Sequence, residues 1–417
     1  MTQAEQSLLL LILLVGAIVV TAILVKSGLE RIGIPPLIGY ILLGVFLGGA
    51  DPQWHLFSAG EREVWEFLAD IGIISLLFRV GLESKLDELM RQLRRASLVW
   101  VGNVFVSGLL GFFTAYSLLK LDLIPSLFIA IAMTATSVGI SVGVWREARA
   151  INSPNGELML DVAEMDDISA VILMALLFAV VPVLGNNPDV STLLPLLGKT
   201  VGLFCFKAVV FGAFCFFFSR YLEKSITSFF FRLEPPPDPT IMVAGMGIII
   251  AALAGLGGFS VAIGAFFAGL LFSRDPRSVK LDASFDTFYE LFVPFFFIGI
   301  GLKIDLAALS TAFDLGMFLL IVAVLGKFVG VAVPVLLMNA EWKSAILLGV
   351  SMAPRAEIAM IVMQHGLQIG AGTVPPRVFA AMVVVSAATS ILVPLVLRPL
   401  LRRWPQIENA PSQIGRG

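Results

Sequence analysis

Four carboxylates stand within seven residues, directly before a long apolar run, in the sequence Asp161-Val-Ala-Glu164-Met-Asp166-Asp167. On a helix, Asp161, Glu164 and Asp167 fall on roughly one face, and Asp166 points about 100° away from Asp167. Hard monovalent cations prefer oxygen ligands, and adjacent carboxylates with exchangeable protons can hold either a cation or protons. The pair therefore predicts a site at which protons and monovalent cations compete.

A plainer interpretation places these carboxylates at the water-exposed cytoplasmic end of their helix. It suits Asp161 and Glu164, which come first in the segment. It suits Asp166 and Asp167 poorly, because they lie about ten residues, or about 15 Å, inside the helix. A charge at that depth is costly and is retained mainly beside a water-filled path or a partner charge.

Two apolar segments carry residues that favour a break in a helix. The segment at 134–141 reads TATSVGIS, and the segment at 349–357 reads GVSMAPRAE. Proline inside a helix removes a hydrogen bond and clashes with the preceding turn, while Ser and Thr hydroxyls can satisfy the freed carbonyls. Broken helices at mid-membrane expose helix ends to a transported ion. The alternative for 134–141 is that its small residues only let helices pack closely.

Three further charges lie in apolar surroundings and can balance such a site. Helix ends that oppose one another need carboxylates near N-termini and cations near C-termini, and Arg355 and Glu357 are placed to serve the second break. Lys327 stands in the apolar sequence LGKFVG. About twelve apolar residues on either side disfavour the alternative, a lysine that snorkels to the membrane surface.

The composition shows what kind of elements must position these residues. Of 417 residues, 58% are hydrophobic and 14% are charged, which excludes a soluble globule. The two histidines, His55 and His365, make a histidine-rich metal site unsuitable, and Cys205 and Cys215, ten residues apart in one apolar stretch, are too far apart on a helix for a disulfide. A net charge of −2 gives no basic field for nucleic acid.

The apolar runs predict an all-α polytopic membrane protein with thirteen transmembrane helices. The turn between the eighth and ninth spans is the weakest boundary, so a count of twelve stays open. The predicted spans are 7–25, 32–50, 64–82, 97–119, 125–145, 158–186, 199–219, 240–255, 258–273, 287–302, 315–338, 344–371 and 378–400.

The distribution of basic residues supports thirteen spans and fixes an orientation. Of 28 Lys and Arg residues, 19 fall in odd-numbered connections or after the last span, 5 in even-numbered connections and 4 within spans. Lys and Arg accumulate on the cytoplasmic side. We therefore expect the N-terminus outside and the C-terminus inside, with residues 401–417 as a short cytoplasmic tail.

The two breakable spans are the fifth and the twelfth, and an offset of seven makes them cross the membrane in opposite directions. Inverted-topology repeats have that property. Spans 4–6 and 11–13 are then the paired triplets, which places the carboxylates of the sixth span beside two crossing discontinuous helices.

With these features the sequence resembles the second branch of the monovalent cation/proton antiporter superfamily. That branch includes bacterial sodium/proton antiporters and the membrane domains of Kef-type potassium/proton systems. The resemblance rests on motifs that occur in order along nearly the whole chain: IPPLIGY at 34–40, LFRVGLE at 77–83, TATSVG at 134–139, Asp166-Asp167, GAFFAG at 264–269, PFFFIGIG at 294–301 and PRAE at 354–357.

The resemblance implies a homodimer in the lipid bilayer, without a cofactor and without enzymatic activity. It implies one transmembrane domain over 1–400, made of a dimerisation region and a core that moves like an elevator, the core including 97–186 and 315–400. It also implies a cation and proton site at the crossing of the broken helices. The resemblance assigns Asp166, Asp167 and Lys327 to that site, with Na⁺, K⁺ or Li⁺ bound at Asp167 and Asp166, while Glu164 is a carboxylate additional to the family pattern. The full set expected at the site is Asp166, Asp167, Thr134, Thr136 and Ser137, with supporting charges Glu164, Lys327, Arg355 and Glu357.

The interpretation is an electrogenic Na⁺/H⁺ antiporter of the bacterial inner membrane, with K⁺/H⁺ exchange or electroneutral exchange as alternatives. A cation channel and a sodium-coupled anion symporter are the competing classes. Uncoupled flux would indicate the channel, and inward substrate flow with sodium would indicate the symporter. A membrane enzyme is disfavoured, because the sequence pairs no nucleophile with a base and has no metal motif.

Overall fold

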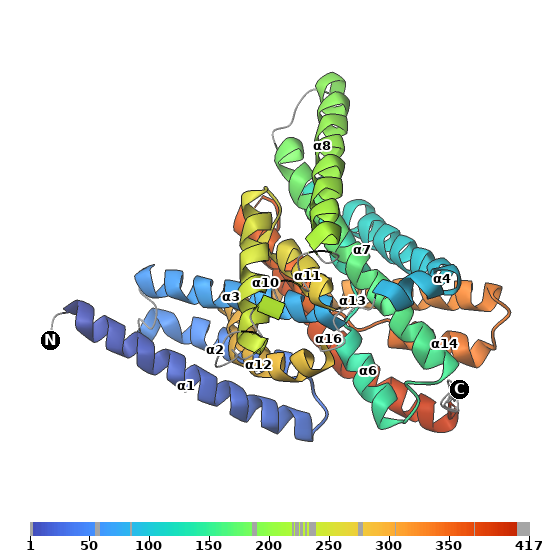
Figure 1. The fold of residues 1–417 in the computed structure, drawn as a ribbon, viewed down its shortest axis with the longest axis horizontal. Coiled ribbons are helices and arrows are strands. Elements are labelled where there is room, and N and C mark those ends of the chain that lie inside the picture. Colours follow the sequence, from blue (N-terminus) through green and yellow to red (C-terminus); the bar gives the residue numbers. More distant parts are fainter. Residues whose placement is uncertain are drawn as a thin grey trace. The chain divides into compact units, whose positions relative to one another are not determined.

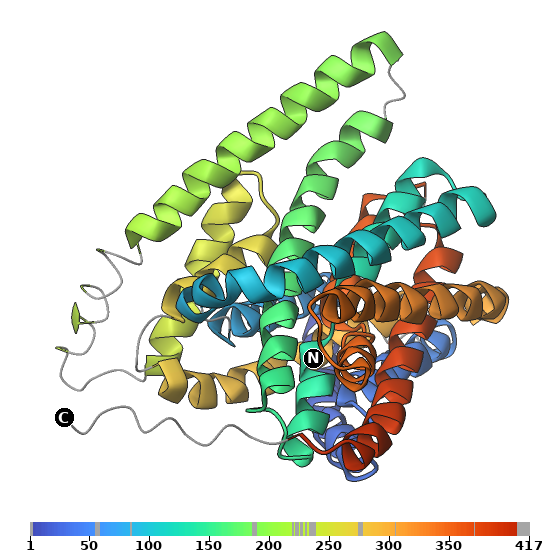
Figure 2. The same ribbon diagram turned by 90° about the vertical axis from the view of Figure 1, so that its right-hand side faces the viewer.

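The computed structural model describes residues 3–54, 59–83, 86–185, 190–218, 221, 225, 228–229, 232, 239–273, 278–304, 306–370 and 372–406. Every regular element in these ranges is a helix, and none of the described residues is in a strand (Figures 1 and 2). The prediction of an all-α chain is therefore confirmed for the described part.

Most of these helices are long and apolar, and several are interrupted where the sequence favours a break. Their bounds are α1 Gln3–Arg31, α2 Pro36–Trp54, α3 Ala59–Glu83, α4 Leu86–Phe113, the π-helical segment η1 Thr114–Leu118, α5 Leu123–Thr134, α6 Val138–Glu147, α7 Pro154–Gly185, α8 Val190–Phe217, α10 Pro239–Leu256, α11 Val261–Phe272, α12 Ser278–Leu302, α13 Leu306–Leu337, α14 Trp342–Ser351, α15 Glu357–Ile369 and α16 Pro376–Arg403.

The chain forms two compact units. The first unit comprises Met1–Leu86 and Gly202–Leu306. In it α3 packs against α11 and α12, while α2 packs against α12 and α10 against α11. Glycines make these contacts close: a Cβ at Gly81 would lie 2.1 Å from the carbonyl oxygen of Phe266, and a Cβ at Gly269 would lie 2.0 Å from that of Phe78. The backbones of α3 and α11 therefore touch without side chains between them, as small residues allow in membrane helices.

The second unit comprises Asp87–Val201 and Ala307–Gly417 and contains every predicted site residue. Here α5 packs against α7 and α15, α6 packs against α7 and α16, and α14 and α15 each pack against α7 and α16. The carboxylate-bearing helix α7 is thus bordered by both pairs of short helices.

Both predicted helix breaks are present in the second unit. Between α5 and α6, Ala135 has φ −65° and ψ 148°, and Ser137 has φ −88° and ψ 98°, so the chain is extended there. Between α14 and α15, residues 352–356 are non-helical and include Pro354. The two breaks meet, because the backbone N–H of Ser137 donates to the carbonyl oxygen of Pro354 at 2.8 Å.

Eight helical stretches of the described chain are long and apolar enough to cross a membrane. Shorter apolar helices occupy Pro36–Asp51, Ile241–Leu256 and Val261–Phe272. The count of thirteen spans and the inverted repeats stay predictions. Within the expected cytoplasmic tail, residues 407–417 lie outside the described chain.

Candidate cation and proton site

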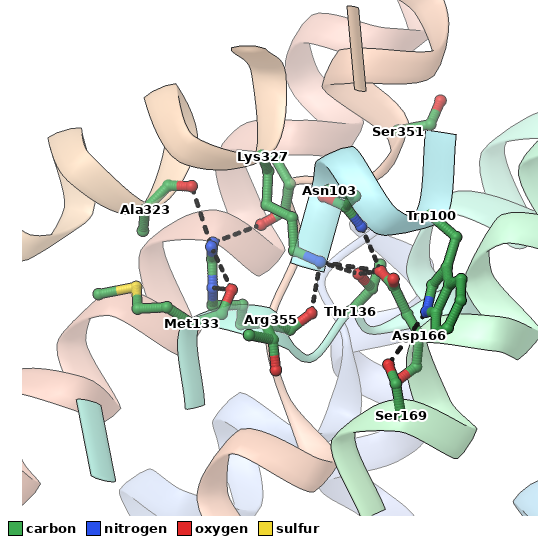
Figure 3. Close-up of polar contacts among 12 residues, drawn as sticks. Trp100, Asn103, Met133, Thr136, Asp166, Ser169, Ala323, Lys327, Ser351 and Arg355 are labelled. Atoms are coloured by element: carbon green, nitrogen blue, oxygen red, sulfur yellow. Dashed lines mark hydrogen bonds and ion pairs between the residues drawn. The ribbon is translucent and has the colours of Figure 1, made fainter. Parts of the chain in front are cut away.

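Asp166 is the centre of a buried polar cluster in the second unit. Its side chain, in the middle of α7, has no exposed surface. Its Oδ2 accepts hydrogen bonds from the Thr136 hydroxyl at 2.7 Å, from Lys327 Nζ at 2.8 Å and from the Asn103 amide (Figure 3). Three donors on one oxygen hold this carboxylate in a single orientation. Its Oδ1 is buried without a hydrogen-bond partner.

Lys327 joins this carboxylate to the first helix break. Its ammonium group, fully buried on α13, also donates to the carbonyl oxygen of Thr134 at 2.5 Å and to the hydroxyl of Thr136 at 2.7 Å. Its third partner is Asp166, with which it forms a buried ion pair. An ammonium group has three donors, and all three find acceptors here.

Arg355 lies in the second helix break and reaches back to the first one. Its guanidinium, fully buried, donates to the carbonyl oxygen of Met133 through Nη2 at 2.9 Å and to that of Ala323 through Nη2 at 3.0 Å (Figure 3). Met133 and Thr134 end α5, so the negative end of the α5 dipole faces both Arg355 and Lys327. Cations at a helix C-terminus are stabilising, as expected for these charges.

The remaining predicted residues surround this cluster in different ways. Asp167 is buried, with 7% of its surface exposed, and Glu164 is half-buried one turn before it on α7. Glu357 is the first residue of α15, where a carboxylate suits the positive end of a helix. The Thr134 hydroxyl donates to the carbonyl oxygen of Ile131 within its own helix, so its contribution to the cluster is its backbone carbonyl. Ser137 has a buried hydroxyl without a hydrogen-bond partner.

A close crossing of α4 and α13 brings the cluster together. A Cβ at Gly102 of α4 would lie 2.7 Å from the carbonyl oxygen of Gly330, and a Cβ at Gly330 of α13 would lie 2.9 Å from the Cα of Asn103. Because the backbones are this close, Asn103 on α4 and Lys327, which is one turn from Gly330 on α13, both reach the carboxylate of Asp166.

Sequence reasoning missed two groups of functional side chains. Asn103 is the only amide in the predicted span 97–119, and a lone amide in an apolar span is the signal that could have found it. A second group braces α6 to α14: the Ser141 hydroxyl donates to the Ser351 carbonyl oxygen at 2.5 Å, and Trp145 Nε1 donates to the Ser351 hydroxyl at 2.8 Å. Ser hydroxyls and Trp side chains are common in apolar helices, so the sequence alone could not identify these contacts.

This arrangement can hold a small cation or a proton out of water. It offers two carboxylates, one paired with a lysine, and buried hydroxyl and carbonyl oxygens at two helix breaks. Oxygens of this kind are the ligands that hard cations prefer. Two buried cations, Lys327 and Arg355, lie in the same cluster and offset the negative charge of the carboxylates.

Comparison with known proteins points in the same direction. Residues 16–403 match the family model described as sodium/hydrogen exchanger, transmembrane. The chain is 28% identical over 374 aligned residues to a Na⁺/H⁺ antiporter of Enterococcus hirae, with 88% of this chain and 92% of that protein covered. It is 27% identical to the Na⁺/H⁺-K⁺ antiporter GerN of Bacillus cereus, with 88% and 90% covered.

The fold is also similar to that of a solved structure, the sodium proton antiporter MjNhaP1 from Methanocaldococcus jannaschii. The TM-score is 0.66, and 95% of this chain and 97% of that chain are covered. The sequence identity is 16%, so this similarity concerns the fold.

Proposed function

Because the chain belongs to the sodium/hydrogen exchanger family, we propose that it is a secondary active antiporter that exchanges Na⁺ for H⁺ across a bacterial cell membrane. The relatives named above are cation/proton antiporters of bacteria. The observation that carries the proposal is the buried Asp166–Lys327 pair at the meeting of two helix breaks, with Asp167 next in sequence. No cofactor and no covalent step is needed for this function.

Asp167 and Asp166 are the proposed ligands of the cation and the proposed carriers of protons. Thr134, Thr136 and Ser137 supply neutral oxygens from the first break, through a carbonyl in the case of Thr134. Lys327, Arg355, Glu164 and Glu357 are the supporting charges. The hydrogen bonds of Lys327 and Arg355 to the end of α5 support the assignment of those two.

The proposed transport cycle is of the elevator type. The core, including 97–186 and 315–400, carries the site across the membrane, and a dimerisation region of a homodimer provides the frame. The division of the chain into two compact units, with every site residue in the second, supports this cycle. In the proposed topology, thirteen spans with inverted repeats place the N-terminus outside and the C-terminus in the cytoplasm.

The test is proton flux in proteoliposomes that hold the purified full chain and an imposed pH gradient. Adding Na⁺, Li⁺ and K⁺ in turn should collapse the gradient, with the strongest response to Na⁺. A response to K⁺ alone would replace Na⁺ by K⁺ in the proposal, and cation flux without proton movement would indicate a channel instead.

A further inference from the structure

Asn103 is a polar residue that is buried within an apolar helix. It stands in the sequence WVGNVFV, within a span of apolar and small residues, and its side chain has no exposed surface. Burying an amide in an apolar medium is unfavourable unless its polar atoms find partners. One partner is evident, because the Asn103 amide N–H donates to Oδ2 of Asp166.

The carbonyl oxygen at the other end of this amide meets no donor in the described part of the chain. Asn103 Oδ1 is buried without a hydrogen-bond partner, and so is Oδ1 of the carboxylate to which Asn103 donates. One hydrogen bond joins the two groups, so each free oxygen belongs to a side chain that is held by the other. Two buried acceptors without donors, on side chains joined by a hydrogen bond, make this part of a dry interior electronegative.

Only a cation or a donor can satisfy two such oxygens together. Asp166 Oδ2 already has three donors, including Lys327 and Thr136, so the lysine is fully occupied on that side. A neutral amide oxygen is a common ligand for hard cations alongside carboxylates. We propose that Asn103 is a specificity-determining residue of the cation site: its N–H orients Asp166, and its carbonyl oxygen and Asp166 Oδ1 coordinate the same monovalent cation. This inference rests on the proposed function.

The position of Asn103 favours selection between cations over general packing. The backbones of α4 and α13 touch at Gly102 and Gly330, so direct backbone contact sets the distance of Asn103 from α13. A ligand on such a rigid element holds its oxygen at a fixed place, and a fixed ligand set discriminates between ions by size.

The experiment is equilibrium binding of radioactive Na⁺ to the detergent-purified full chain, with competition by K⁺. In Asn103→Leu, which keeps the volume and removes both polar atoms, the half-saturating Na⁺ concentration should rise about tenfold, the effect of one good contact. The Na⁺ to K⁺ preference should change as well. Asn103→Ser keeps a donor and an acceptor and should recover part of the affinity.

Ser107→Ala is the matched control. Ser107 is one turn further along α4 and is buried, and its hydroxyl forms no hydrogen bond with Asp166 or any other described residue. Its half-saturating Na⁺ concentration should equal that of the wild type. An unchanged value in Asn103→Leu, or an equal rise in Ser107→Ala, would overturn the inference.

The outcome is separable from that of the proposed function. If the wild type binds Na⁺ with the expected dependence on Asn103 but catalyses no exchange in proteoliposomes, the antiporter proposal fails and this site stands. If the wild type binds no Na⁺, this inference is wrong.

Discussion

Asp166 and Asp167 are adjacent in sequence and differ in how much of their surface is exposed. Asp166 has three donors on one oxygen and an ion pair with Lys327, all without exposed surface. Asp167 retains 7% exposure and is one of the carboxylates on the face that Glu164 shares. The more accessible carboxylate, Asp167, is the better candidate for repeated exchange of cation and proton, and Asp166, with its three donors, is the better candidate for orienting the site.

At this scale we predict that Asp167→Asn abolishes exchange while the protein stays folded. An amide has nearly the same shape but cannot alternate between a bound proton and a bound cation. The measurement is pH-gradient-driven cation uptake into proteoliposomes, together with the melting temperature of the purified protein. Uptake above the level of empty vesicles would remove Asp167 from its role.

Asp122→Asn provides the control for this substitution. Asp122 is exposed, precedes α5 in the same unit, and its side chain makes no capping hydrogen bond. Exchange in this variant should match the wild type, since surface substitutions change little.

Among the elements, α5 has an unusual C-terminal end. It stops inside the unit rather than at water, so its last carbonyls need donors from elsewhere. Lys327 supplies one to Thr134 and Arg355 supplies two to Met133. The two broken spans are therefore joined by charge-assisted hydrogen bonds as well as by the Ser137–Pro354 backbone bond.

We predict that Arg355→Ala damages both stability and transport. It leaves the carbonyl oxygens of Met133 and Ala323 without these donors, at a cost of about 3 kcal/mol or more of unfolding free energy. Arg355→Lys should recover only part of the loss, because one ammonium does not reproduce the planar fork of guanidinium donors. Thermal unfolding and turnover are the measurements. Wild-type values for both in Arg355→Ala would disprove the role given to this crossing.

Arg398→Ala is a matched control in the same unit. Arg398 pairs with Glu147 at 3.0 Å, with 33% and 53% of the two side chains exposed. Exposed pairs of this kind contribute about 0 to 1 kcal/mol, so the melting temperature should hardly change.

For the whole molecule, the charge moved in each cycle follows from the ion pair of Asp166. With a cation bound, both carboxylates are expected to be ionised. When it leaves, protons return either to both carboxylates, or to Asp167 and to a Lys327 that gave up its proton when the cation displaced it from Asp166 and that now pairs with Asp166 again. Two protons then exchange for one cation, and one net charge crosses the membrane.

We therefore predict electrogenic exchange. One charge per cycle is worth about 2.3 kcal/mol per 100 mV of membrane potential, so the potential should change both rate and end point. The measurement is transport into vesicles clamped at different potentials under a fixed pH gradient. A rate and end point that ignore the potential would mean one proton per cation, with Asp166 and Lys327 permanently paired.

Orientation in the membrane is a second property of the whole molecule. We predict that residues 83–96, which lie between the predicted spans 64–82 and 97–119 and include the start of α4, are cytoplasmic, because basic residues gather in the connections on that side. In a variant without Cys205 and Cys215, Ser84→Cys should react with a membrane-impermeant thiol reagent only after the cells are opened. Asn187→Cys, in a connection predicted outside, should react in intact cells, and the reverse pattern would refute the topology.

Much of this protein is determined by local sequence. Apolar runs of about 20 residues are long enough to cross a bilayer, and they mark helices without reference to any other part of the chain. Both helix breaks follow from local chemistry too, since Pro354 and the hydroxylated segment at 134–137 disturb the helix in which they stand. The depth of Asp166, Asp167 and Lys327 is likewise a matter of counting along a helix.

Only the tertiary structure decided which atoms meet. Arg355 and Met133 are 222 positions apart, and Lys327 and Asp166 are 161 apart, so their contacts depend on how distant helices cross. The close approach of α4 and α13 at Gly102 and Gly330 places Asn103 beside Asp166. The Thr134 side chain adopts a rotamer in which its hydroxyl donates to the Ile131 carbonyl oxygen of its own helix. Side-chain period predicts the face of a helix, but the partner on that face is fixed by packing between helices, which sequence period does not contain.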